Sequence, residues 1–148
     1  MPSCAYCKDY KRICIYSSTL PSTFKYYPQY LNHFIQHCCK YLLYPSDDGN
    51  PFLVAIPFLA RTSPALCNSM VAIAAGHLSR TGCNYGFKVT KQDHKLCADW
   101  SYAFGAEYLG KAINDETKRV SDSTLAACLL LCIYEVISPI HDLRAFPY

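Results

Sequence analysis

The chain lacks an apolar run long enough to cross a membrane. A membrane-spanning helix needs about 20 consecutive apolar residues, and the most apolar run, from Leu125 to Tyr134, is much shorter. The first residues, Met1 to Cys4, also lack the apolar stretch of a secretory signal peptide. These two absences lead us to expect an intracellular protein that is not held in a membrane.

Charged residues are also few. They make up 17% of the chain, and the formal net charge is +3 at pH 7. An excess this small gives no support for a general attraction of the whole chain to nucleic acid.

The sequence patterns of common enzyme sites are missing too. The chain contains no glycine-rich phosphate loop, no nucleophile elbow and no dinucleotide-binding fingerprint. Two pairs of neighbouring carboxylates occur, Asp47–Asp48 and Asp115–Glu116, but both fall in predicted turns, where exposure to solvent explains them. We therefore predict that the protein is not an enzyme and has no catalytic residues.

Apolar residues, in contrast, are abundant. They make up 51% of the 148 residues, which is too many for a disordered chain and enough for one globular domain. Apolar positions recur at steps of three and four residues, and no segment alternates between apolar and polar residues in the manner of a strand. These patterns predict an all-α fold.

Local signals mark where the helices begin and end. Pro28 suits a first helical turn, Ser63 with Pro64 suits the start of another helix, and Gly82 suits its end. Pro57 is expected to kink or break the short helix that contains it. The predicted helical segments run from residue 28 to a turn at 44–49, and over residues 51–59, 64–79, 92–115 and 125–137.

Apolar stripes on these helices predict the core. Gly76 is expected to allow a neighbouring helix to approach closely, and the last helix is apolar enough to be buried on most of its circumference. The side chains assigned to the core are Leu66, Met70, Ile73, Leu78, Leu96, Trp100, Phe104, Tyr108, Ile113, Leu129 and Ile133.

The chain contains ten cysteines, which raises the question of a disulfide framework. Most of them stand where small apolar residues belong, as Cys128 and Cys132 do in the last helix and Cys38 and Cys39 in the first. Buried free cysteine behaves as a small apolar residue, and intracellular thiols stay reduced. We therefore expect core thiols rather than disulfides.

Three segments together resemble a known family. Residues 125–135 are similar to the leucine-rich helix ending in Tyr-Glu of the fungal-specific transcription factor domain, the regulatory region of fungal zinc-cluster activators. Residues 50–78 and 108–115 resemble its preceding helices, in the same order. The likeness covers about residues 30–137 and corresponds to the N-terminal part of a domain that is normally longer, so we expect a truncated form.

The N-terminal cysteines bear on the same family. Cys4, Cys7 and Cys14 have the spacing of the first half of the fungal binuclear zinc cluster, with basic residues between the last two. The second half is missing, because the next cysteine is Cys38. Three thiolates cannot complete a four-coordinate structural zinc site. We therefore expect no resident cofactor, with weak zinc binding by these three cysteines as the alternative.

The histidines offer a second set of metal ligands. His33 and His37 are four residues apart on the first helix, next to Cys38, but the glutamate that a zinc protease carries between such histidines is absent. We expect both to be partly exposed helix residues without a metal. The family resemblance places His77 at the histidine of an Ala-His-Leu pattern, for which we predict a hydrogen bond inside the helical core.

These inferences divide the chain into two regions. Residues 1–27 are interpreted as a basic, cysteine-containing tail and linker, either a flexible tail that happens to contain cysteines or the remnant of a damaged zinc cluster. Residues 28–148 are interpreted as the truncated helical regulatory domain. The resemblance implies a nuclear regulator of RNA polymerase II transcription that acts by protein interaction or by self-association through apolar helix faces. DNA binding by this chain alone is not expected. The alternative is a small cysteine-rich protein that responds to metals or to redox state.

Overall fold

The computed structural model describes residues 25–42, 50–82 and 88–138. Within these ranges the chain is all-α and has no strand, as the sequence predicts. The α-helices are α2 (Tyr27–His33), α3 (Pro51–Ala60), α4 (Pro64–Thr81), α5 (Lys91–Asn114) and α6 (Asp122–Ile137). None of the described helices is both long and apolar enough to span a membrane.

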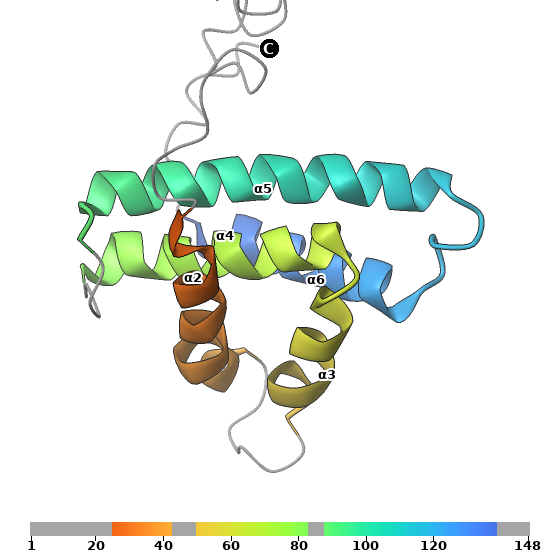
Figure 1. Ribbon diagram of the computed structural model, residues 1–148, viewed down its shortest axis with the longest axis horizontal. Helices are drawn as coiled ribbons and strands as arrows, with labels where there is room; N and C mark the ends of the chain where they lie inside the picture. Colours follow the sequence, from red (N-terminus) through yellow and green to blue (C-terminus); the bar gives the residue numbers. More distant parts are fainter. Residues whose placement is uncertain (1–24, 43–49, 83–87, 139–148) are drawn as a thin grey trace, which may run out of the picture.

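Helix α4 is the centre of the fold, because it contacts each of the other four α-helices. It lies beside α5, which runs in the opposite direction, and α6 lies behind it (Figure 1). Helices α2 and α3 both project from α4 on the side away from α5 (Figure 1). The central position explains why α4 is mostly apolar and why its buried residues are spread around the helix rather than along one stripe.

The ends of α4 follow the local signals closely. The Ser63 hydroxyl accepts a hydrogen bond from the backbone N–H of Leu66, and Pro64 occupies the first turn. At the other end Gly82 adopts a left-handed conformation with φ of 69°, and its N–H donates to the carbonyl of Leu78. A residue with a Cβ is strained in this conformation, which is why glycine suits the position.

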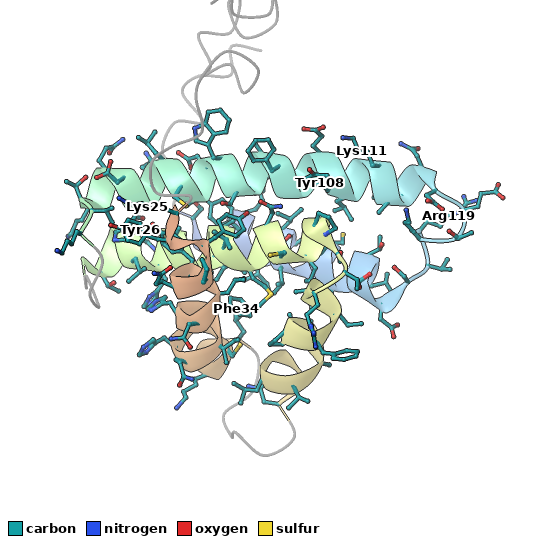
Figure 2. The ribbon with its side chains drawn as sticks, viewed as in Figure 1. Lys25, Tyr26, Phe34, Tyr108, Lys111 and Arg119 are labelled. Carbon is teal, nitrogen blue, oxygen red and sulfur yellow. The ribbon has the colours of Figure 1, made fainter. Side chains whose placement is uncertain are left out.

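The first helical segment changes its winding along its length. Helix α2 passes directly into a π-helical turn, Phe34–Cys38, and then into a 3₁₀ turn, Cys39–Tyr41. The sequence predicted one uniform helix here. Tyr30 and Phe34 are fully buried, and Phe34 lies on the side of this segment that faces α3 (Figure 2).

Helix α3 continues through Pro57, which the sequence analysis expected to interrupt it. Proline removes one backbone N–H and therefore one hydrogen bond of the helix, a loss that does not end α3. Apolar packing helps to hold the helix: Ile56 is buried and Leu53 and Leu59 pack against the core.

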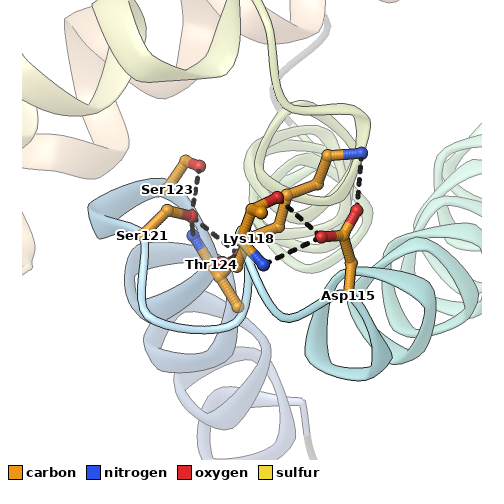
Figure 3. A network of polar contacts seen from close by, with 6 residues as sticks. Asp115, Lys118, Ser121, Ser123 and Thr124 are labelled. Carbon is orange, nitrogen blue, oxygen red and sulfur yellow. Dashed lines mark hydrogen bonds and ion pairs between the residues drawn. The ribbon is translucent and has the colours of Figure 1, made fainter.

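Polar contacts hold the connection between α5 and α6 (Figure 3). The Asp115 carboxylate accepts hydrogen bonds from the hydroxyl and the N–H of Thr117, at 2.7 and 3.0 Å, and pairs with Lys118 at 3.1 Å. The hydrogen bonds to Thr117 and then the Lys118 contact lower the pKa of Asp115 to about 2. Ser121 starts α6, because its hydroxyl accepts from the N–H of Thr124.

The predicted core is correct on α4 and only partly correct on α5 and α6. All four core residues predicted on α4 are buried, as is Trp100 on α5, and Ile133 packs against the core from a partly buried position. Tyr108, Ile113 and Leu129 are exposed by 39, 49 and 43%, so their assignment to the core is wrong. Tyr108 lies instead beside the Lys111 ammonium, 5.1 Å from the ring centre (Figure 2).

Candidate functional site

The outer face of α6 exposes a row of apolar and thiol side chains. Leu125, Leu129 and Val136 are exposed by 61, 43 and 84%, and Cys128 and Cys132 are exposed with them. The prediction that this helix is buried on most of its circumference, with its two thiols in the core, is therefore wrong. The buried side of α6 carries Ala127, Leu130, Leu131 and Tyr134.

The exposed row has the spacing of a helix-packing seam. Leu125, Leu129, Cys132 and Val136 follow one another at steps of four, three and four residues. These steps are those of the d and a positions of a heptad repeat, which form one narrow apolar line along a helix. We refer to these four residues as the α6 seam.

Helix α6 is firmly attached on its other sides. The Tyr134 hydroxyl donates to Asp99 of α5 at 3.2 Å, and the Tyr102 hydroxyl donates to Glu135. The rings of Tyr102 and Tyr134 stack with their centres 5.1 Å apart. Burial, followed by the contact with Glu135, raises the pKa of Tyr102 to about 12, so both phenols stay protonated donors at neutral pH.

A cleft of about 470 Å³ lies where the end of α4, the first turns of α5 and the end of α6 meet. Arg80, Lys91 and Lys95 line it together with the Asp99 carboxylate. The Arg80 guanidinium also donates a hydrogen bond to the carbonyl of Ile137, the last residue of α6. Of the four charged residues that line the cleft, three are therefore cationic.

A cluster of imidazole and thiol groups lies between the first helical segment and α4. Nε2 of His33 is 3.0 Å from Nδ1 of His77, and the ligand atoms of His33, Cys38 and His77 all lie within 4.8 Å of one another. The ring of His37 also lies beside the ring of His33, and their centroids are 4.7 Å apart.

Burial controls the protonation of this cluster. It lowers the pKa of His33 to about 4, also lowers that of His77, and raises the pKa of the Cys38 thiol to about 12. The imidazoles of His33 and His77 are therefore neutral at physiological pH, which is the form that binds metals.

The structure corrects one histidine prediction and confirms another. His33 is 3% exposed, so the expectation that it is partly exposed is wrong, whereas His37 is partly exposed as predicted. The predicted hydrogen bond of His77 is present and joins it to His33. The two are 44 residues apart, and no local pattern could have shown that they meet.

The remaining cysteine predictions divide into two groups. Cys38, Cys39 and Cys97 are buried thiols, in agreement with the sequence analysis. Cys4, Cys7 and Cys14, the predicted metal ligands, lie outside the described residues.

The described residues form a helical domain with an exposed apolar seam on α6. The chain belongs to the fungal specific transcription factor domain family, which matches residues 29–140. It therefore has the domain of a transcription regulator, and the family is not one of enzymes. Neither a curated protein nor a solved structure matches the chain.

Proposed function

We propose that this protein acts in the nucleus as a regulatory module of RNA polymerase II transcription, by interaction rather than by catalysis. Its membership of the transcription factor family supports a regulatory role. The observation that carries the mode of action is the α6 seam, an exposed apolar line on a helix whose opposite side is packed against the core.

The surface that best fits the α6 seam is the α6 seam of a second copy of the chain. A two-fold symmetric interface brings a surface against itself, which requires that the surface be self-complementary. The four seam residues are uncharged. Two such seams therefore bring no charged seam residues together, as in the apolar contact of two-stranded helical pairs.

Burial of the α6 seam would supply part of the energy that a dimer needs. Full burial of a leucine or valine side chain is worth about 1.5–3 kcal/mol. Further burial of the exposed parts of Leu125, Leu129 and Val136 in both copies therefore yields several kcal/mol. Part of this offsets the entropy lost on association.

Sedimentation velocity of the full chain under reducing conditions tests the proposal. We expect a dimer at micromolar concentrations and a monomer for Leu129→Lys, because a lysine in the seam places charge in the apolar contact. Val54→Lys is the matched control, since Val54 is 77% exposed on α3, outside the seam, and should leave the dimer intact. A monomeric wild type would contradict self-association. Equal dissociation by both variants would contradict the α6 seam as the interface. Either result would leave another protein as the occupant of the seam.

The regulatory role is tested separately. The full chain, fused to an unrelated DNA-binding domain, should change transcription of a reporter gene in a fungal host, and Leu129→Lys should reduce this change while Val54→Lys does not. A fluorescent fusion should accumulate in the nucleus. A reporter that does not respond to the wild-type fusion would contradict the regulatory role.

A further inference from the structure

Two separate parts of the fold bring soft metal ligands to one place. His33 ends α2, Cys38 ends the π-helical turn that follows it, and His77 lies on α4. Their three ligand atoms lie within 4.8 Å of one another, and His33 and Cys38 are buried. We propose that His33, Cys38 and His77 form a binding site for one zinc ion, with the fourth position taken by water.

The π-helical turn is what places His33 and Cys38 together. They are five residues apart, and in an α-helix such residues point about 140° away from each other around the axis. In a π-helix the hydrogen bonds join residues five apart, as the N–H of Cys39 does with the carbonyl of Phe34. This wider winding carries Cys38 round toward the face of His33. Single π-turns within helices are frequent at functional sites.

The distances are near those that zinc requires. With zinc–nitrogen bonds of about 2.0–2.1 Å and a zinc–sulfur bond of about 2.3 Å, tetrahedral geometry places ligand atoms about 3.3–3.6 Å apart. The observed separation of the two imidazole nitrogens is 3.0 Å, and no pair exceeds 4.8 Å. Side-chain rotations that move the ligand atoms by about 1 Å therefore complete the site.

The proton balance of binding is simple. One imidazole now donates its N–H to the other, and zinc takes the place of that shared proton. The donor ring moves to its other tautomer, so both facing nitrogens offer lone pairs to the metal. The Cys38 thiol becomes a thiolate and releases one proton to solvent, as metal binding by cysteine requires.

The donor set selects the kind of metal. Two imidazoles and a thiolate are the ligands of zinc and of other borderline or soft ions, whereas magnesium and calcium prefer oxygen. Zinc sites with three protein ligands keep a water molecule in the fourth position.

The site also has a route of entry. Cys38 and His77 line an apolar opening of about 360 Å³, together with Leu42, Ile73, Arg80 and Ile137. The Arg80 guanidinium opposes a cation there but favours a thiolate at Cys38, and its hydrogen bond to Ile137 directs it toward the end of α6. The proposed site is separate from Cys4, Cys7 and Cys14, for which the sequence analysis gave weak zinc binding as the alternative to no resident metal.

Cobalt, which takes the place of zinc and absorbs light, tests the proposal directly. The protein used is the full chain carrying Cys4→Ser, Cys7→Ser and Cys14→Ser, so that the N-terminal thiols contribute nothing. We expect it to bind one equivalent of Co²⁺ with a sulfur-to-metal absorption band, and we expect added Zn²⁺ to remove the band. Absence of the band in this protein overturns the proposal without the need for a further substitution.

Further variants in the same background identify the ligands. Cys38→Ser should abolish the band, and His77→Gln should weaken cobalt binding about tenfold or more, while circular dichroism shows that both remain helical. The matched controls are Cys97→Ser and His94→Gln, which alter a buried thiol and a buried imidazole outside the cluster and should leave binding unchanged. A band that survives Cys38→Ser but is lost on Cys128→Ser with Cys132→Ser would overturn the assignment.

Discussion

A methyl group on Gly76 of α4 would lie 3.1 Å from Cε2 of Tyr134 on α6. This separation is shorter than ordinary carbon–carbon contact, so the two helices meet here because residue 76 has no side chain. The sequence predicts a close approach at Gly76 but does not identify the neighbour that makes it. Tyr134 is buried and is bonded to Asp99, which limits its freedom to move aside.

Replacement of Gly76 by alanine should therefore destabilise the protein. Alanine is favoured over glycine within a helix by about 1 kcal/mol, but forcing a methyl group into a packed contact costs about 1–3 kcal/mol. We expect a net loss in the free energy of unfolding, measured by urea denaturation. The matched control is Gly110→Ala on α5, where a Cβ would meet no atom within 4 Å, and which should stabilise by about 0.5–1 kcal/mol. Equal effects of the two substitutions would contradict the packing argument.

The N-terminal cap of α5 should make a separate contribution. The Thr90 hydroxyl accepts from the N–H of Asp93 at 3.1 Å, and the Asp93 carboxylate accepts from the N–H of Thr90 at 2.8 Å. Thr90→Ala removes the first of these bonds and should lower the free energy of unfolding by about 1 kcal/mol. Gln92→Ala, in the same turn and exposed, should change it by less than about 0.5 kcal/mol in the same denaturation experiment.

The two ends of α4 could be predicted from the local sequence. Ser63 and Gly82 act through groups a few residues away, and their roles could be read from the sequence because no distant part of the chain is involved. The exposure of Leu129 and the meeting of His33 with His77 depend on where other helices pack. Apolar periodicity predicts that a helix has an inner face, but on a helix as uniformly apolar as α6 it does not predict which face that is.

Acid should destabilise the fold through its buried histidines. His94 is fully buried, its Nδ1 lies 2.8 Å from the Tyr30 hydroxyl, and burial lowers its pKa below the usual 6.5. The unfolded chain therefore takes up a proton at a higher pH than the folded one. Stability should be independent of this group above about pH 6.5 and should fall as the pH drops below that value, with a slope of up to about 1.4 kcal/mol per pH unit for one proton.

The free energy of unfolding, measured by denaturation at several pH values between 7.5 and 5, tests this effect. His94→Gln should reduce the slope, because glutamine does not titrate. Part of the slope should remain, since burial also lowers the pKa of His33 and His77. A slope that His94→Gln does not change would show that His94 has the same pKa in the folded and unfolded chain.

The reactivity of individual thiols should report both the fold and the α6 seam. Cys128 and Cys132 are exposed, whereas Cys38 and Cys97 are buried. Brief treatment with a maleimide at low protein concentration, followed by digestion and mass spectrometry, should label Cys128 and Cys132 before Cys38 and Cys97, which should react only after unfolding.

Because the seam is proposed to be covered in a dimer, labelling of Cys132 should slow as the protein concentration rises. In Leu129→Lys the labelling rate should be independent of concentration. Rapid labelling of Cys38 in the folded protein would contradict its burial, and labelling of Cys132 that does not change with wild-type concentration would contradict a dimer through α6.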